Sequence, residues 1–270
     1  MEYPIRSFAD INGLRLYHEI HGSGRPVVLL HGGLQTIDLM FGQLLPTLAA
    51  RRQLIAVELQ GHGHTADTDR TMSIDQLADD VAALLAHLSI EEADIFGFSL
   101  GGLVGWSLVI RHPKVVGRVA VASADYRSRK AAPDEVPRPM PTDADFQAMR
   151  DAYAAVAPDP SHFDALAEKV STMVNKDFVG WTADELRAVQ RPTLVLVGDN
   201  DLVRVSDAVE AVELVPHGQL AVFPGTTHMD MTRSPQRILS VLVPFLDADR
   251  ATVGREARPS RTVRAFQPPR

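Results

Sequence analysis

The pentapeptide Gly97-Phe98-Ser99-Leu100-Gly101 constrains the fold of this chain more than any other stretch. An apolar run leads into it and a helical pattern follows it directly. This arrangement predicts a strand that turns sharply into a helix, with Ser99 at the tip of the turn and a helix N-terminus behind its hydroxyl. Glycine is expected at 97 and 101, where a Cβ would collide with a neighbouring strand or helix. A glycine-rich turn without chemistry fits the pentapeptide as well.

The composition excludes several classes of protein. The 270 residues are 45% hydrophobic and 23% charged, as in ordinary globular proteins, and they suffice for a large core. No apolar stretch approaches the length of a membrane span, and residues 1–6 lack the pattern of a signal peptide, so we predict a cytoplasmic protein without membrane contact. Cysteine is absent, which excludes disulfides and thiolate sites. The net charge of −7 argues against nucleic acid as the main partner.

Strand and helix patterns alternate along most of the chain. Two alternating segments, 7–11 and 14–20, flank Asn12-Gly13 and predict a hairpin. Continuous apolar runs predict strands buried on both faces, at 26–30, 54–59, 94–98, 116–123, 193–197 and 219–223. Helical patterns fall between or after these runs, at 74–88, 100–110, 206–214 and from Pro235 onward; Ser73 and Gln76 predict a capping box for the helix at 74–88. Such alternation predicts a mostly parallel sheet with an antiparallel edge.

Residues 126–190 break this alternation, because they contain many prolines and three short amphipathic helices but no strand pattern. We interpret them as a helical lid over the carboxyl ends of the strands, where open α/β sheets bind ligands. The predicted division is a core of residues 1–125 and 191–249, this lid, and an Arg-rich tail of residues 250–270. The candidates for a mostly apolar substrate pocket are Leu34 and the lid residues Phe146, Met149, Tyr153, Met173 and Trp181.

The order of three side chains predicts nucleophilic catalysis. A serine hydroxyl becomes a good nucleophile when a base takes its proton and a carboxylate orients that base. Downstream of Ser99, Asp199 and Asp201 follow the strand at 193–197, and His228 follows the strand at 219–223. A serine, an aspartate and a histidine therefore come in this order, each just beyond the carboxyl end of a strand.

Five segments together resemble the α/β-hydrolase fold superfamily. They are the turns at 31–33 and 61–63, the elbow at 97–101, residues 198–201 and residues 224–228. The likeness extends over residues 7–248 and is weakest in the lid. It implies a mostly parallel eight-stranded sheet flanked by helices, with a small helical lid, and it implies no metal or organic cofactor.

The resemblance also implies roles for individual residues. Ser99 would be the nucleophile, His228 the general base and Asp201 the acid that orients it. Asp199 would then form the turn, although it stays an alternative for the acid. Asp125 occupies a substitute position for the acid that is known in some relatives.

An oxyanion hole needs two backbone N–H groups near the nucleophile. The first should come from Leu100, the residue after Ser99, and by resemblance the second comes from Gly33. His31 would support the turn that carries Gly33. Leu34 stands where lipases and esterases of this kind have a third glycine, so the chain departs from their pattern there.

Two further clusters allow competing interpretations. His62, His64, Asp67 and Asp69 could suggest a metal site, but this place is expected to be a sharp turn, so we predict no metal. In the tail, Arg255, Arg258, Arg261 and Arg264 recur every three residues, the period of a polyproline-II strand. In a polyproline-II strand these arginines would share one edge, and this edge could dock on the acidic body or on a neighbouring subunit. A loose, solvated tail fits the pattern equally well.

The sequence therefore predicts a serine hydrolase, in the first place an esterase that cleaves a small or medium carboxylic ester through an acyl-enzyme. Lactone hydrolysis, carbon–carbon bond hydrolysis and perhydrolysis use the same triad and stay open. A slow-turnover ligand receptor or signalling regulator on the same fold is an alternative of another class. The expected partner is a small-molecule ester or lactone, and homodimerisation stays open.

Overall fold

The computed structural model describes residues 4–128 and 138–249. The Arg-rich segment with Arg255, Arg258, Arg261 and Arg264 lies outside the described residues, so its docking stays a prediction. None of the helices in the described ranges has the length and apolarity that crossing a membrane requires.

One eight-stranded sheet runs through the molecule in the order β1-β2-β4-β3-β5-β6-β7-β8. β1 pairs antiparallel with β2, and β2 with β4, whereas the remaining neighbours are parallel. This confirms the predicted fold class. The strands are β1 (Ile5–Ile11), β2 (Leu14–His21), β3 (Arg25–Leu30), β4 (Arg52–Val57), β5 (Ala93–Phe98), β6 (Val116–Ala122), β7 (Thr193–Asn200) and β8 (Gly218–Thr227).

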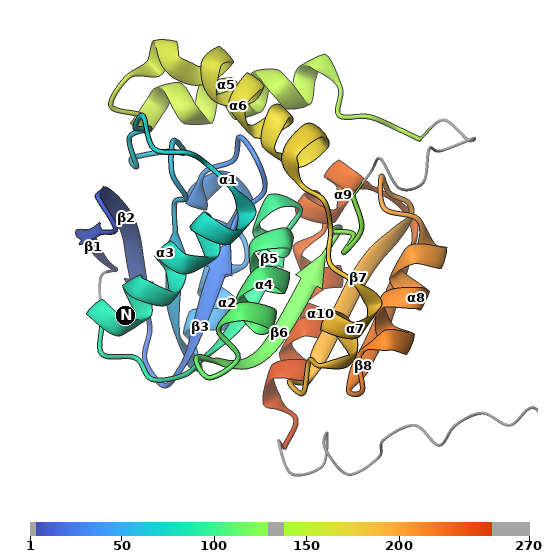
Figure 1. Cartoon of the computed structure of the whole chain (residues 1–270). Coiled ribbons are helices and arrows are strands. Elements are labelled where there is room, and N and C mark those ends of the chain that lie inside the picture. Colours follow the sequence, from blue (N-terminus) through green and yellow to red (C-terminus); the bar gives the residue numbers. More distant parts are fainter. Residues whose placement is uncertain (1–3, 129–137, 250–270) are drawn as a thin grey trace, which may run out of the picture.

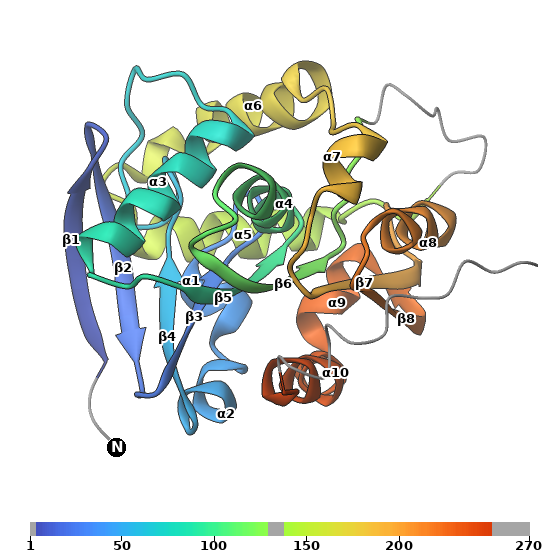
Figure 2. The ribbon, with the colours of Figure 1, turned by 60° about the horizontal axis from the view of Figure 1, so that its bottom comes forward.

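Helices cover both faces of the sheet (Figure 2). One face carries α3 (Ile74–His87), α4 (Leu100–Arg111) and α8 (Val205–Leu214), and the other carries α1 (Ile37–Phe41), α2 (Leu45–Ala49) and α10 (Pro235–Asp247). Along β3, Val28 and Leu30 belong to the first core and Val27 and Leu29 to the second. Because both faces of β3 are buried from Val27 to Leu30, this part of its sequence is continuously apolar instead of alternating.

The start of α3 differs in one detail from the predicted capping box. The Ser73 hydroxyl accepts the Gln76 N–H at 3.1 Å, as expected for an N-cap. The Gln76 side chain instead donates to Asp80 Oδ1 at 3.4 Å. Asp80 is buried and also binds Arg70, so it offers Gln76 a charged acceptor, and only half of the capping box forms.

Two helices, α5 (Asp143–Val156) and α6 (Phe163–Thr172), lie across the end of the molecule near α9 (His228–Arg233) (Figure 1). α6 continues into a π-helical turn, η3 (Met173–Asp177). The short helix α7 (Ala183–Arg187) packs instead beside α8. We refer to α5, α6 and η3 as the cap helices.

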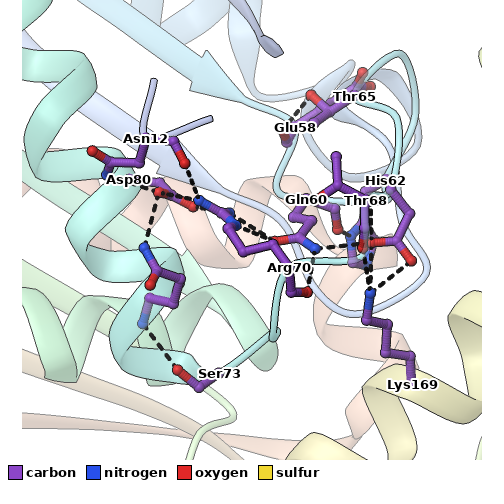
Figure 3. Close-up of polar contacts among 12 residues, drawn as sticks. Asn12, Glu58, Gln60, His62, Thr65, Thr68, Arg70, Ser73, Asp80 and Lys169 are labelled. Atoms are coloured by element: carbon purple, nitrogen blue, oxygen red, sulfur yellow. Dashed lines mark hydrogen bonds and ion pairs between the residues drawn. The ribbon is translucent and has the colours of Figure 1, made fainter. Parts of the chain in front are cut away.

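A polar network ties the cap helices to the core (Figure 3). In the loop after β4, Asp67 accepts two bonds from Lys169 Nζ of α6, at 2.8 and 2.9 Å, and lies 3.1 Å from His162 Nε2. Burial alone would raise the pKa of Asp67, but hydrogen bonds from Lys169, Gln60, the Thr68 N–H and His162 lower it to about 2. Asp67 is therefore a charged anchor for α6.

A second ion pair connects α5 to α9. The Asp145 carboxylate forms a capping box with Thr142 at the start of α5 and also binds Arg233, the last residue of α9. Asp145 is buried, whereas the Arg233 side chain is 56% exposed. The cap helices are thus joined to the core at two separate points, one on α6 and one on α5.

Candidate active site

Ser99 has the strained backbone that a sharp strand-to-helix turn requires. It follows β5, precedes α4 and has φ 51° and ψ −114°, a conformation uncommon for a residue with a Cβ. A Cβ on Gly97 would lie 2.1 Å from the Gly101 carbonyl oxygen, and one on Gly101 would lie 2.1 Å from that of Leu30. These contacts explain why glycine flanks Ser99 on both sides.

Four polar side chains meet at one edge of the sheet. Ser99, Ser123, Asp201 and His228 are each the first residue after a strand, namely β5, β6, β7 and β8 in turn. Because these four strands are neighbours and parallel, their carboxyl ends lie side by side. Residues far apart in the sequence are brought together by the pairing of the sheet alone.

His228 links the serine to an aspartate. Its Nε2 lies 3.0 Å from Ser99 Oγ, and its Nδ1 lies 2.8 Å from Asp201 Oδ1. Both distances are those of hydrogen bonds. The Thr227 hydroxyl accepts the Asp230 N–H at 3.2 Å and so caps α9, the helix that begins at His228.

Asp201 is fully buried and bound through both of its oxygens. Oδ1 faces His228 and accepts the Val203 N–H at 3.3 Å, while Oδ2 accepts the Ser123 hydroxyl. Burial alone would raise the pKa of Asp201, but the hydrogen bond and charge of His228 and the donors Ser123 and Val203 lower it below its usual range. Asp201 is therefore held as a carboxylate beside the imidazole.

Ser123 is a site residue that the sequence analysis missed. Its hydroxyl is buried, and its φ of 55° turns the chain away from β6. Its position could have indicated this role, because Ser123 directly follows β6, and β6 is the neighbour of β7, the strand that Asp201 follows. The predicted strand at 116–123 includes Ser123, whereas β6 ends at Ala122.

The two alternative acids have other hydrogen-bond partners. Asp199 Oδ1 accepts the Thr226 N–H at 3.1 Å and helps to hold the end of β8. Asp125 Oδ1 accepts the Arg127 N–H at 3.0 Å. Of the three aspartates considered, it is Asp201 whose carboxylate contacts His228.

The turn after β3 lies next to the nucleophile. A Cβ on Gly33 would be 3.9 Å from the Leu100 Cβ, and Leu100, as the first residue of α4, has an N–H without a partner inside the helix. His31 supports this turn, since its Nδ1 lies 2.8 Å from the Gly32 carbonyl oxygen and its Nε2 accepts the Leu59 N–H at 3.1 Å. Burial and the neighbouring His62 lower the pKa of His31 to about 3, so its imidazole is neutral.

A cavity of about 450 Å³ opens at Ser99 and His228, between the core loops and the cap helices. Leu34, Phe146 and Met149, three of the predicted pocket residues, line it. Phe178, another lid residue whose packing was expected to decide the substrate, also lines it. Further lining residues were not predicted; they are Gln35, Leu103, Asp125, Arg127, Met140, Val170, Ser171, Val174, Asn175, Leu202, Val203 and Met229.

Three predicted pocket residues, Tyr153, Met173 and Trp181, lie outside the residues that line this cavity. Tyr153 packs against the Phe163 ring at 5.5 Å, Trp181 packs against the Phe178 ring at 4.9 Å, and Met173 is buried in the core. Met173 belongs with Phe163, Leu166 and Val170 to one buried apolar stripe, and this stripe packs into the core.

The histidines of the loop after β4 have other partners. His62 Nδ1 lies 2.9 Å from the Gln60 carbonyl oxygen, and His64 Nδ1 lies 2.8 Å from Glu58 Oε2. Within residues 4–128 and 138–249, no group of three or more His, Asp or Glu side chains is arranged to hold a metal ion.

Comparison with known proteins identifies the family. The family model for the alpha/beta hydrolase fold matches residues 25–178. The chain belongs to this family. It is 28% identical to a non-heme haloperoxidase of Rhodococcus erythropolis, over 88% of this chain and 97% of that protein. It is also 24% identical to a 2-hydroxymuconate semialdehyde hydrolase of Pseudomonas sp. (strain CF600), over 89% of this chain and 94% of that protein.

Solved structures agree on the fold of this family member. A serine hydrolase involved in carbazole degradation superposes with a TM-score of 0.75 at 21% identity, covering 90% of this chain and 99% of that one. An N-acyl homoserine lactone degrading enzyme superposes with a TM-score of 0.67 at 24% identity, covering 89% and 100%. The comparisons support a hydrolase of this family and leave its substrate open.

Proposed function

We propose that this chain is a serine hydrolase that cleaves a small or medium carboxylic ester through an acyl-enzyme intermediate. The observation that carries the proposal is the pair of hydrogen bonds that joins Ser99, His228 and Asp201, at 3.0 and 2.8 Å. This relay lies at a mostly apolar cavity of about 450 Å³, a size that suits a small organic substrate.

In the proposed first step, Ser99 Oγ attacks the ester carbonyl carbon and His228 Nε2 takes the hydroxyl proton. Asp201 holds the other ring nitrogen and balances the positive charge of the imidazolium. The N–H groups of Gly33 and Leu100 are the proposed donors to the oxyanion. The tetrahedral intermediate collapses when His228 returns the proton to the leaving alcohol, which leaves the acyl group on Ser99.

In the second step, water opens the acyl-enzyme. His228 removes a proton from the water as its oxygen bonds to the acyl carbon, and the same donors stabilise the second oxyanion. The carboxylic acid leaves and the Ser99 hydroxyl is restored. A lactone would follow the same steps, with the alcohol still attached to the released acid.

Perhydrolysis is the second candidate, because two of the relatives are named as non-heme haloperoxidases or chloroperoxidases. Hydrogen peroxide would replace water in the second step. One of its oxygens would bond to the acyl carbon while His228 takes its proton, and a peracid would leave instead of an acid. The two reactions require the same residues, so they differ only in the molecule that attacks the acyl-enzyme, water or hydrogen peroxide.

Labelling with a fluorophosphonate tests the proposal. We expect covalent modification of the wild type and none of Ser99→Ala, because the reagent reacts with an activated serine. Hydrolysis of a panel of p-nitrophenyl esters and lactones, with and without hydrogen peroxide, would then identify the reaction. An unlabelled wild type, or equal ester turnover by Ser99→Ala, would overturn the proposal. Very slow turnover combined with tight ligand binding would instead support a receptor.

A further inference from the structure

The cavity has one charged wall that the proposed relay does not use. Asp125 and Arg127, in the segment after β6, both line the cavity that contains Ser99 and His228. The Asp125 side chain is 23% exposed, so its carboxyl group is partly accessible. Most of the other lining is apolar, as at Leu103, Val170 and Val203. Burying an ionisable group among apolar side chains costs free energy, so its presence here points to a structural or a substrate-binding role.

The positive charge of Arg127 is already engaged by carboxylates. Its Nη1 lies 3.0 Å from Glu210 Oε2, its Nη2 contacts Asp207, and its Nε lies 3.8 Å from Asp125 Oδ1. Asp207 also binds Arg204, with Arg204 Nε 2.9 Å from Asp207 Oδ2. Among the described residues of this cluster, three carboxylates face two guanidinium groups, so these five groups carry an excess negative charge when all are ionised.

Asp125 is the carboxylate of this cluster on the cavity side, since Asp207 and Glu210 belong to α8 and are not among the residues that line the cavity. Burial raises the pKa of Asp125, the Arg127 N–H lowers it, and the charge of Asp207 raises it again, to about 6. At pH 8 the group is therefore ionised. A carboxylate that enters the same cavity with a substrate would meet a like charge in a setting that screens it less than water.

We propose that Asp125 is a specificity-determining residue whose carboxylate selects substrates that place no negative charge in the cavity. The inference rests on the proposed function and deepens it, because it restricts the substrate to neutral or cationic esters and lactones. The mostly apolar lining of the cavity, with Leu103, Val170 and Val203, favours the same class, since these side chains offer no hydrogen bond to an anion.

The test compares isosteric ester pairs that differ by one charge. On the acyl side, the pair is the p-nitrophenyl monoester of adipic acid and p-nitrophenyl 6-oxoheptanoate, in which a methyl group replaces a carboxylate oxygen. On the alcohol side, the pair is 4-carboxyphenyl acetate and 4-acetylphenyl acetate. The kcat/KM of each ester is measured at pH 8 for the full-length wild type, Asp125→Asn and Glu210→Gln, with Ser99→Ala as the background.

Asp125→Asn keeps the side-chain oxygen that accepts the Arg127 N–H and removes only the charge. We expect the preference of the wild type for the neutral ester to fall by about tenfold in this variant, for at least one pair, through faster reaction of the anionic ester. Glu210→Gln changes the same cluster away from the cavity and should leave both ratios within about twofold.

Two outcomes would overturn the inference while leaving the proposed function intact. One is a wild type that prefers the anionic ester in both pairs, and the other is an Asp125→Asn variant whose two ratios equal those of the wild type. If Asp125→Asn is unfolded by circular dichroism, Asp125→Ser replaces it, because serine also offers an oxygen to the Arg127 N–H. If the wild type is neither labelled by a fluorophosphonate nor active on any ester, the proposed function fails and this inference falls with it.

Discussion

The relay and the cap helices are attached to the molecule in opposite ways. Ser99, Asp201 and His228 each directly follow a strand of the parallel part of the sheet, so the backbone hydrogen bonds of the sheet fix their spacing. The cap helices bury Met149 and Leu166 in the core and are also joined to it by the side-chain ion pairs Lys169–Asp67 and Arg233–Asp145, whose cations are 31% and 56% exposed. The comparison suggests that the chemistry depends on a few buried contacts, whereas substrate access depends on several weaker ones.

The largest expected effect on catalysis comes from a change in the buried relay, at Asp201. Asp201→Asn should lower kcat by about 10³- to 10⁴-fold, because the amide favours the wrong imidazole tautomer and cannot balance its charge. Asp199→Asn is the matched control, since that exposed carboxylate contacts the Thr226 N–H instead. Steady-state kinetics on one ester checks both. Equal losses in the two variants would show that the acid has been assigned wrongly.

Ser123 should contribute less, because it contacts the acid and not the reacting atoms. Ser123→Ala removes a donor to buried Asp201 Oδ2 and should lower kcat/KM by about tenfold. Ser123→Gly also lacks the hydroxyl but tolerates the φ of 55°, so it separates hydrogen bonding from backbone strain.

We expect both Ser123 variants to lose activity, and to lose nothing further when combined with Asp201→Asn, because the hydroxyl acts through that carboxylate. The pH profile of kcat/KM should also shift in the single variants, which a purely structural defect would not produce. Wild-type activity in Ser123→Gly would contradict this role.

The cap should show the smallest effect on chemistry and a measurable one on binding. Asp67→Asn weakens the contact with Lys169 and should raise KM by about two- to fivefold with little change in kcat, as α6 is held less firmly. Asp69→Asn, an exposed neighbour in the same loop, should leave KM unchanged. A loss of kcat with unchanged KM would show that the cap takes part in the chemistry itself.

Asp67 also predicts a pH-dependent difference in stability. Its folded-state pKa of about 2 lies below the value near 4 of an unfolded chain, so its contribution is complete above pH 4 and is lost as the pH falls toward 2. Wild type should exceed Asp67→Asn by about 1 kcal/mol in the free energy of unfolding at pH 7. Urea titrations between pH 7 and pH 3 should show this gap narrowing, and a gap that widens in acid would contradict the ion pair.

The same contrast explains which parts could be predicted from the sequence. Local patterns predict the alternation of strands and helices and place Ser99, Asp201 and His228 just after strands. The resemblance to the α/β-hydrolase fold implies that these strands are neighbours whose carboxyl ends lie together. Tyr153 and Met173 do not line the cavity, because a helical stripe does not tell which of two apolar surroundings a side chain enters; Trp181 lies between helices, where no stripe exists to place it. The pairing of Arg127 with Asp207 and Glu210 joins residues about 80 positions apart, and no local pattern signals it.

The short helix α9 begins with His228 and ends with Arg233, and Arg233 is bound by Asp145 at the start of α5. The proposed proton acceptor and one of the two ion-paired residues that hold the cap therefore occupy opposite ends of a single helix of six residues. A displacement of α5 would act on this helix through the Asp145–Arg233 pair. The Asp145–Arg233 ion pair therefore links the start of α5 to the helix that positions the imidazole.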